Sequence, residues 1–142
     1  MKITAINEYK KSDEINGMKL CVSEEDIDDI MCAALEGGIT DWCECIRIKK
    51  RIDGANFASE QIAKGGTLEF KVIESFDEKE TEWYLLNKKK FLKGLSKFLK
   101  KTFGKECLYE RMNKLYVDTC YIDAERADAI IQYALFGEIV YG

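Results

Sequence analysis

The sequence of 142 residues contains no histidine and no proline, and its longest uninterrupted apolar run, residues 30–35, is six residues long. The absence of histidine excludes Ser-His-Asp and Cys-His nucleophile pairs, His-ligated zinc and acid–base catalysis by imidazole. The absence of proline excludes PxxP ligands and turns built on a cis-proline. The apolar run is far shorter than the roughly 20 residues of a membrane-spanning helix, so we expect no membrane segment.

Cysteine is present, but its spacing does not favour metal binding. The six cysteines include the pair Cys43-x-Cys45, and no CxxC pair occurs. Polar residues after Met1, among them Lys2 and Lys10, interrupt any secretory signal. We therefore expect a cytoplasmic protein with reduced, free thiols. The sequence predicts no metal site and no cofactor.

Acidic and basic residues are concentrated in separate segments. The formal net charge is −4, whereas a general nucleic-acid coat protein would be basic. Residues 24–36 hold six acidic side chains and no basic one, while residues 88–105 hold eight lysines and no acidic one. The two segments could face each other or face different partners, and the sequence leaves both alternatives open.

Capping residues and apolar periodicity predict three helices. From cap to stop, they run from Ser23 to Gly38, from Asn87 to Gly104 and from Asp123 to Gly137, with a shorter helical piece over 59–64. Phe103 is expected to extend the apolar stripe of the second, lysine-rich helix.

Alternation of apolar and polar residues predicts the central strands, an apolar run predicts the first, and a stretch rich in β-branched and aromatic residues predicts the one after the lysine-rich helix. They are expected at 18–22, 42–49, 67–73, 81–86 and 115–122, with a short terminal strand at 139–141. A polar turn at 75–79 would join the third and fourth strands into a hairpin. The fold class predicted is α+β, with about three helices packed on a mostly antiparallel sheet of about five strands. Residues 1–142 form one domain, of which 1–16 are expected to be loosely ordered.

Two glycine-containing segments are candidates for a ligand site. In the first, Glu36 precedes Gly37-Gly38, which allow a ligand or a second backbone to come close. Trp42 follows, and Arg47 and Arg51 lie along the next strand. An indole can stack on a base, and a guanidinium can bind phosphate or carboxylate through two hydrogen bonds. The alternative is that the glycines end a helix and that Trp42 belongs to the core.

In the second segment, Gln61 and Lys64 precede Gly65-Gly66. Gln61 could bind a base or sugar, and Lys64 with the glycine amides could bind phosphate, although no P-loop or GxGxxG motif is present. The alternative is an ordinary connection between a helix and a strand. The lysine-rich helix is a third candidate: it could bind nucleic acid, an anionic membrane or an acidic protein, or be a solvated face.

No motif in the chain predicts catalysis. Any acid–base group would have to be a carboxylate, lysine, tyrosine or cysteine, and no such groups are paired recognisably in the sequence. We therefore predict that the protein is not an enzyme.

Several motifs occur together along the chain. They are EDIDDIM (25–31), ALEGGI (34–39) followed by Trp42-Cys43, ASEQI (58–62) followed by GGT (65–67), FLKG (91–94) and QYALFGE (132–138). The set resembles a small family carried by phages and prophages of gut Firmicutes, over most of the chain beyond Met18. The resemblance implies a phage setting inside a host cell. Small accessory phage proteins often block host defence, so it also implies a counter-defence role by association.

The leading hypothesis is a binding protein that captures a nucleotide-derived small molecule. The ligand-binding residues expected are Glu36, Trp42, Arg47, Arg51, Gln61 and Lys64. One alternative is an inhibitor that binds a host defence protein, and a second is a nucleic-acid binder acting through the helix between Lys88 and Lys105. A homo-oligomer is compatible with the sequence, which contains no heptad seam.

Overall fold

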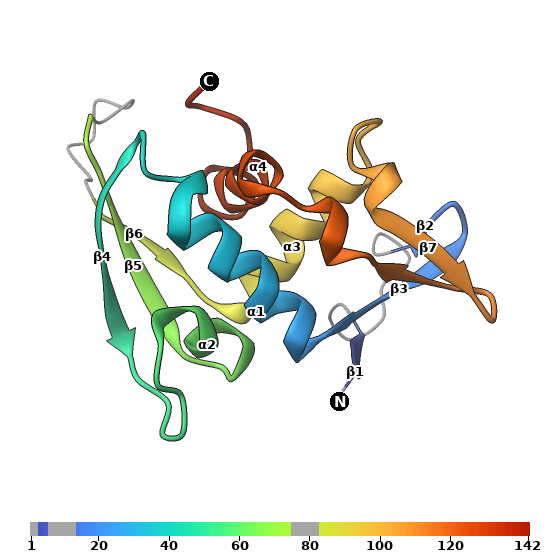
Figure 1. Ribbon diagram of the computed structural model, residues 1–142, viewed down its shortest axis with the longest axis horizontal. Coiled ribbons are helices and arrows are strands. Elements are labelled where there is room, and N and C mark those ends of the chain that lie inside the picture. The colour runs from blue at the N-terminus through green and yellow to red at the C-terminus, as the bar shows by residue number, and fades with distance from the viewer. Residues whose placement is uncertain (1–2, 6–13, 75–82) are drawn as a thin grey trace.

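The computed structural model describes residues 3–5, 14–74 and 83–142, with eight strands and four α-helices among them (Figure 1). The strands are β1 (Ile3–Ala5), β2 (Glu14–Ile15), β3 (Met18–Ser23), β4 (Cys43–Lys50), β5 (Thr67–Val72), β6 (Trp83–Leu86), β7 (Leu108–Arg111) and β8 (Lys114–Val117). The helices are α1 (Glu24–Ala33), α2 (Ala58–Ala63), α3 (Lys88–Leu99) and α4 (Ala124–Phe136). A π-helical turn (Ala34–Gly38) follows α1, and 3₁₀ turns lie at Lys105–Cys107 and Thr119–Tyr121.

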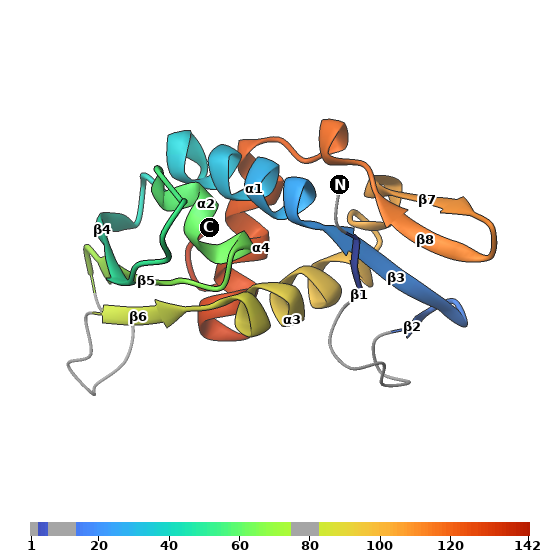
Figure 2. The same cartoon turned by 90° about the horizontal axis from the view of Figure 1, so that it is seen from below.

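The strands form two sheets rather than the single sheet that was predicted. In the first sheet, β1, β3, β8 and β7 pair in that order and β2 also pairs with β3; in the second, the order is β4, β5, β6. Only β3 and β8 are parallel among the described strand pairs. The sheets lie at opposite ends of the long axis, because the helices occupy the middle of the molecule (Figures 1 and 2). The α+β class is confirmed.

Helix α4 is the centre of the fold. Its apolar residues Ala127, Ile130 and Ile131 are fully buried, and it lies between α1 and α3 in the view of Figure 2. The acidic α1 and the lysine-rich α3 are therefore on opposite sides of α4. The structure resolves the question that the sequence left open, since the two charged segments do not pack face to face.

The helix starts agree with the predicted caps. Ser23 Oγ accepts from the amide of Asp26 at 3.0 Å, and Asp26 Oδ2 accepts in return from the amide of Ser23 at 3.0 Å. Asn87 Oδ1 accepts from the amide of Lys90, and Asp123 Oδ1 accepts from the amide of Arg126, each at 2.9 Å. These bonds satisfy amides that have no partner inside the helix.

Two glycines allow helices to approach closely. A Cβ at Gly94 of α3 would lie 2.5 Å from the backbone nitrogen of Ala134 on α4. A Cβ at Gly38 would lie 2.5 Å from the carbonyl oxygen of Ala124, at the start of α4. The glycine pair that was considered as a ligand contact therefore admits a second stretch of backbone, α4 itself.

Some predicted elements are wrong in extent. Helix α3 ends at Leu99 rather than before Gly104, so Phe103 lies beyond it and is 49% exposed. The strand expected at 115–122 ends at Val117, and a 3₁₀ turn follows.

Of the other strand predictions, one is wrong and one is confirmed, and three strands were not predicted. Residues 139–141 form no strand, because a side chain of α4 takes up their backbone hydrogen bonds. The predicted hairpin pairing of β5 with β6 is confirmed, and the turn at 75–79 lies outside the described residues. Of residues 1–16, the structure describes β1, β2 and Asn16, and neither strand was predicted; nor was β7.

Candidate functional site

Trp42 is a core residue. It is 4% exposed, and its indole Nε1 donates to Asp128 Oδ1 at 2.6 Å. Its ring is stacked on Tyr141, with centroids 5.4 Å apart and planes 5° apart, and meets Phe136 edge-on at 5.5 Å. The indole is therefore buried, stacked on one ring of the chain and in edge contact with another, and the core alternative holds in place of the base-stacking one.

Gln61 and Lys64 close a loop. Gln61 is fully buried; its Oε1 accepts from the amide of Ile52 at 2.8 Å, and its Nε2 donates to the carbonyl of Ala55 at 3.3 Å. Lys64 Nζ donates to the carbonyl of Gly54 at 3.2 Å. These bonds hold the loop between β4 and α2 against α2 itself, so Gln61 has a structural partner for each end of its amide.

Arg47 lies on the outer face of the second sheet. Its guanidinium binds Glu69 Oε2 through Nε at 2.9 Å and through Nη2 at 2.7 Å. It also covers the ring of Trp83, 3.8 Å from the centroid. The hydrogen bond from Arg47, followed by that from Lys49, lowers the pKa of Glu69. This guanidinium is already engaged by a carboxylate and an indole.

The six predicted ligand-binding residues do not converge. Glu36 and Arg51 are exposed, Arg47 faces outward from its sheet, and Trp42 and Gln61 are held inside the fold. The predicted pocket is therefore not formed in this structure. The physical reason is that contacts within the fold, which residue spacing does not show, engage the polar and aromatic groups of Trp42, Arg47, Gln61 and Lys64.

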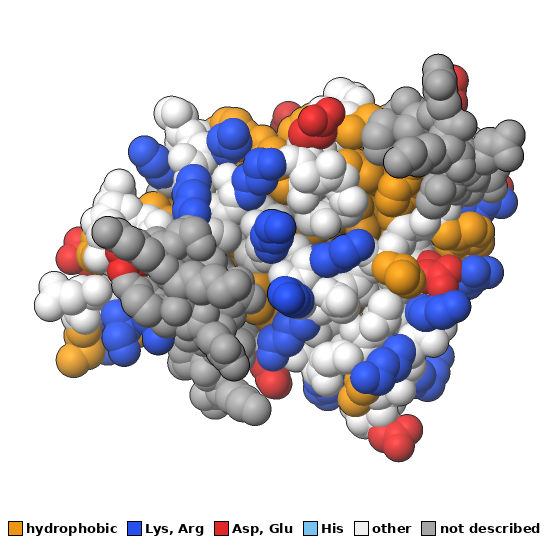
Figure 3. Space-filling model, turned by 180° about the vertical axis from the view of Figure 1, so that it is seen from behind, with side chains coloured by type: hydrophobic (Ala, Val, Ile, Leu, Met, Phe, Trp, Pro, Cys, Tyr) orange, Lys and Arg blue, Asp and Glu red, His pale blue; other side chains and the backbone are white. Residues whose placement is uncertain are grey.

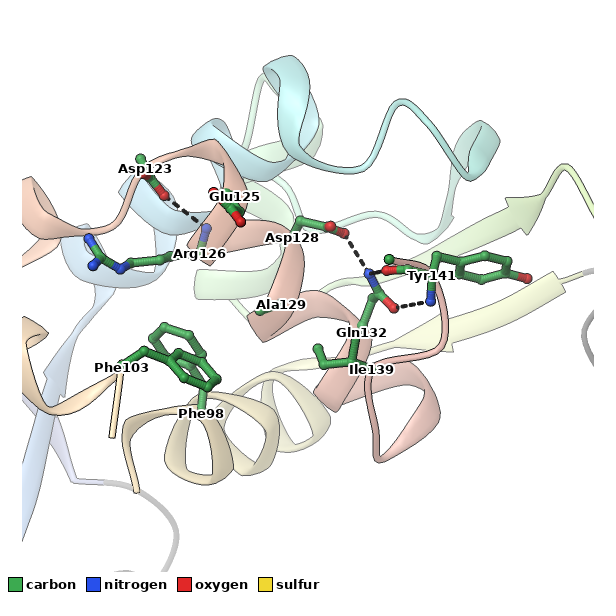
Figure 4. A pocket seen from close by; sticks show the side chains of 11 residues that line it. Phe98, Phe103, Asp123, Glu125, Arg126, Asp128, Ala129, Gln132, Ile139 and Tyr141 are labelled. Carbon is green, nitrogen blue, oxygen red and sulfur yellow. Dashed lines mark hydrogen bonds between the residues drawn. The ribbon is translucent and has the colours of Figure 1, made fainter. Parts of the chain in front are cut away.

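A hollow of about 430 Å³ lies elsewhere, between α4, the end of α3 and the C-terminal tail formed by residues 137–142 (Figure 4). Its lining comprises Phe98, Phe103, Ala129 and Ile139, the charged residues Asp123, Glu125, Arg126 and Asp128, and Gln132, Tyr141 and Gly142. The phenyl rings of Phe98 and Phe103 meet edge-on at 5.3 Å and form one wall. This volume is within the range of small-molecule sites, about 300–1,000 Å³.

Gln132 builds the opposite wall by holding the tail. Its Oε1 accepts from the amides of Val140 and Tyr141 at 2.9 and 2.8 Å, and its Nε2 donates to the carbonyl of Tyr141 at 3.0 Å. Nε2 also donates to Asp128 Oδ1 at 3.1 Å. The amide is 1% exposed and fully hydrogen-bonded, so it shapes the hollow but has no capacity left for a ligand.

The charge inside the hollow is negative. Arg126 is the one cation in the lining, and it pairs with Glu106 and donates to the carbonyl of Tyr121 at 2.8 Å. Asp123, Glu125 and Asp128 remain as carboxylates. Burial raises the pKa of Asp128, the hydrogen bonds from Trp42 and Gln132 oppose this, and the charges of Asp41 and Glu125 raise it further.

Sequence reasoning missed this hollow. Asp128 and Gln132 are four residues apart, beside the apolar face predicted for the third helix, and residues so spaced share one side of a helix. That polar pair at the edge of a buried stripe was the available signal. The tail that completes the site was assigned to a strand instead.

A second hollow, of about 240 Å³, lies between α1 and α2 and is lined by Glu24, Glu25, Asp28, Glu60, Ala63 and Lys64. Lys64 is the one predicted site residue that lines either hollow, and its Nζ lies 3.7 Å from Glu60 Oε2. Over residues 3–5, 14–74 and 83–142, no group of three or more Cys, Asp or Glu side chains is placed to hold a metal ion.

Comparison with known proteins adds no family assignment. No protein-family model, curated protein or solved structure matches the chain. No helix in the described part of the chain is long and apolar enough to cross a membrane. The fold and the hollow therefore carry the functional argument alone.

Proposed function

We propose that this protein binds a small organic cation, an amine attached to an apolar body, in the hollow between α4 and the C-terminal tail. One observation carries the proposal. The hollow has apolar walls, and because Gln132 and Arg126 are already engaged, the charged groups in its lining that can bind a ligand are carboxylates. A carboxylate accepts hydrogen bonds and attracts positive charge, so the group that fits is an ammonium or a guanidinium.

The apolar part of the ligand would lie against Phe98, Phe103 and Ile139. Phe103 is 49% exposed and Ile139 is 43% exposed, so both lose water contact when the hollow is filled. An ammonium over the face of Phe103 adds about 0.5–1 kcal/mol at an exposed site. The acidic end is at the N-terminal half of α4, where Glu125 and Asp128 are three residues apart on one side of the helix.

The same charges disfavour an anionic ligand. A phosphate in this hollow would face Asp123, Glu125 and Asp128, while Arg126 is occupied by Glu106. The observations therefore support a small-molecule binding protein, as expected from the sequence, but with a ligand of opposite charge. In the phage setting that the motifs imply, such a protein would withdraw an amine from the host cell.

Calorimetric titration with three probes of one shape tests the proposal. Phenethylamine, phenethyl alcohol and phenylacetate share the ring and differ in charge. We expect the amine to bind at least about tenfold more tightly than the alcohol, and the anion to bind least, because a buried charge needs an opposite partner. The proposal is wrong if none of the three binds, or if phenylacetate binds best.

Two variants place the binding at the hollow. Glu125→Gln removes one negative charge from the lining at constant shape, and we expect it to weaken amine binding. The matched control is Glu110→Gln on β7, which removes an exposed carboxylate outside the hollow. If the two substitutions weaken amine binding equally, the affinity depends only on the net charge of the protein, and this would contradict binding in the hollow.

A further inference from the structure

The solvent-facing side of α3 is a dense array of positive charge. It consists of Lys88, Lys89, Lys90, Lys93, Lys97, Lys100 and Lys101, named here the lysine face. Figure 3 shows Lys and Arg side chains gathered across the middle of this side of the molecule, with few acidic side chains among them. In the part of the chain that the structure describes, Lys89, Lys93 and Lys97 form no ion pair with a carboxylate.

Three of these lysines contact a backbone carbonyl or a tyrosine ring. Lys90 Nζ donates to the carbonyl of Leu85 at 3.1 Å, and Lys97 Nζ donates to the carbonyl of Gly137. Lys97 and Lys101 lie over the ring of Tyr133, at 5.7 and 5.8 Å from its centroid. Such contacts position an ammonium without neutralising it, so they leave the positive charge of these three lysines in place.

The spacing of the charges matches a phosphate backbone. The 12 residues of α3 rise about 18 Å along the helix axis and carry five lysines, and Lys100 and Lys101 follow directly after the helix. Along α3 this is one positive charge per roughly 3.6 Å, against one phosphate per roughly 3.4 Å of axis along each strand of duplex DNA. The acidic segment cannot mask this charge, because α1 lies on the other side of α4.

A membrane surface fits this face less well. A helix that lies on a membrane inserts its apolar side among the lipids. Here the apolar side of α3 is already in the core, with Phe91, Leu95 and Phe98 fully buried. Only the charged side is available, and it offers nothing to anchor in hydrocarbon.

We infer that the lysine face of α3 binds the phosphate backbone of nucleic acid without reading its sequence. The inference is independent of the amine-binding hollow, since it concerns the outer side of a different helix. Its energy is electrostatic, so binding should fall steeply as salt rises.

The test is a salt titration of binding to a fluorescent duplex of arbitrary sequence, with the full chain. For the double variant Lys89→Glu/Lys93→Glu we expect affinity at about 50 mM salt to fall at least tenfold and the slope of log K against log salt to lessen by about 2. These two lysines are chosen because Lys97 also holds the tail. The matched control is Arg111→Glu/Lys114→Glu, the same charge change on exposed residues of the β7–β8 hairpin, which should retain most of the affinity.

Three outcomes would overturn the inference. They are no binding at low salt, an equal loss in the two double variants, and equally tight binding of a polyglutamate probe or of anionic vesicles at the same salt. Circular dichroism of both variants separates a lost surface from a lost fold. Because all four substituted side chains are exposed, both variants are expected to remain folded.

Discussion

Replacement of Gln132 by leucine tests the construction of the hollow most directly. Leucine keeps much of the side-chain volume but removes the amide, which makes four hydrogen bonds: two from the amides of Val140 and Tyr141, one to the carbonyl of Tyr141 and one to Asp128. At about 1 kcal/mol net for each bond, the loss reaches about 4 kcal/mol if the tail stays in place.

The tail can also detach in the variant, and this case sets the lower limit of the loss in the free energy of unfolding. Once residues 139–142 are in water, their amides are solvated and the penalty falls to the packing that the tail provided. That packing includes the Tyr141 ring stacked on Trp42 at 5.4 Å, and such a ring pair adds about 0.5–1.5 kcal/mol beyond the area it buries. We therefore expect Gln132→Leu to lower the free energy of unfolding by about 2–4 kcal/mol.

The chain offers a matched control in Gln61→Leu. Gln61 is equally buried but makes two amide hydrogen bonds, to Ile52 and Ala55, and lies far from the tail in sequence. Its replacement should cost about half as much, roughly 1–2 kcal/mol. Urea unfolding followed by fluorescence gives both values, and hydrogen exchange of the Val140 and Tyr141 amides reports on the tail.

The two variants should also differ in ligand binding. Gln132→Leu releases a wall of the hollow and should abolish phenethylamine binding, whereas Gln61→Leu should preserve it. The reasoning is refuted if Gln132→Leu costs no more than Gln61→Leu while the tail amides keep their protection. In that case the tail is held by something other than the Gln132 amide.

Further predictions concern packing, protonation and thiol reactivity. Gly94→Ala should lower stability by about 1–2 kcal/mol in urea unfolding, because the added methyl meets Ala134 and overpacking outweighs the gain in helix propensity; a more stable variant would contradict this. The raised pKa of Asp128 means that its proton is bound more tightly in the folded state, so this group makes stability fall as pH rises from the unfolded pKa to the raised folded one. The Asp128→Asn variant keeps an acceptor for Trp42 and should lack this fall in stability. Unfolding curves with the same pH dependence as those of the unsubstituted protein would contradict this role of Asp128. In native alkylation followed by mass spectrometry, exposed Cys45 and Cys120 should react well before buried Cys21 and Cys107, since burial raises the pKa of Cys107 to about 11; early labelling of Cys107 would show that this region opens.

Local rules were sufficient for the starts of three helices and for the end of α4. A cap accepts hydrogen bonds from amides within three residues of itself. Ser23 and Asp123 therefore predict the starts of α1 and α4 without reference to the rest of the chain. The stop at Gly137 is equally local, because its φ of +79° is a conformation that glycine adopts without strain. The fold class followed from these starts and from the alternating strands.

The sequence does not show which side chains contact each other in the fold. Trp42 and Asp128 are 86 residues apart and meet at 2.6 Å, and no spacing rule relates them. Residue spacing does not distinguish an exposed indole from a buried one, so Trp42 was predicted as a ligand contact with the core as its alternative. The candidate site failed at the step where each side chain had to be assigned a partner.

The division of the strands between two sheets could not be predicted for the same reason: the sequence does not show which elements contact each other. The alternation in β4 indicates that this strand has one buried side, but it does not show which helix covers that side. Placing α4 at the centre separates the two groups of strands and also separates the acidic α1 from the lysine face of α3. One packing choice thus decides both the sheet count and the charge distribution. A net charge of −4 then describes neither surface. The proposed cation site takes its carboxylates from Asp123, Glu125 and Asp128 at the start of α4, and the proposed polyanion site takes its lysines from the outer side of α3.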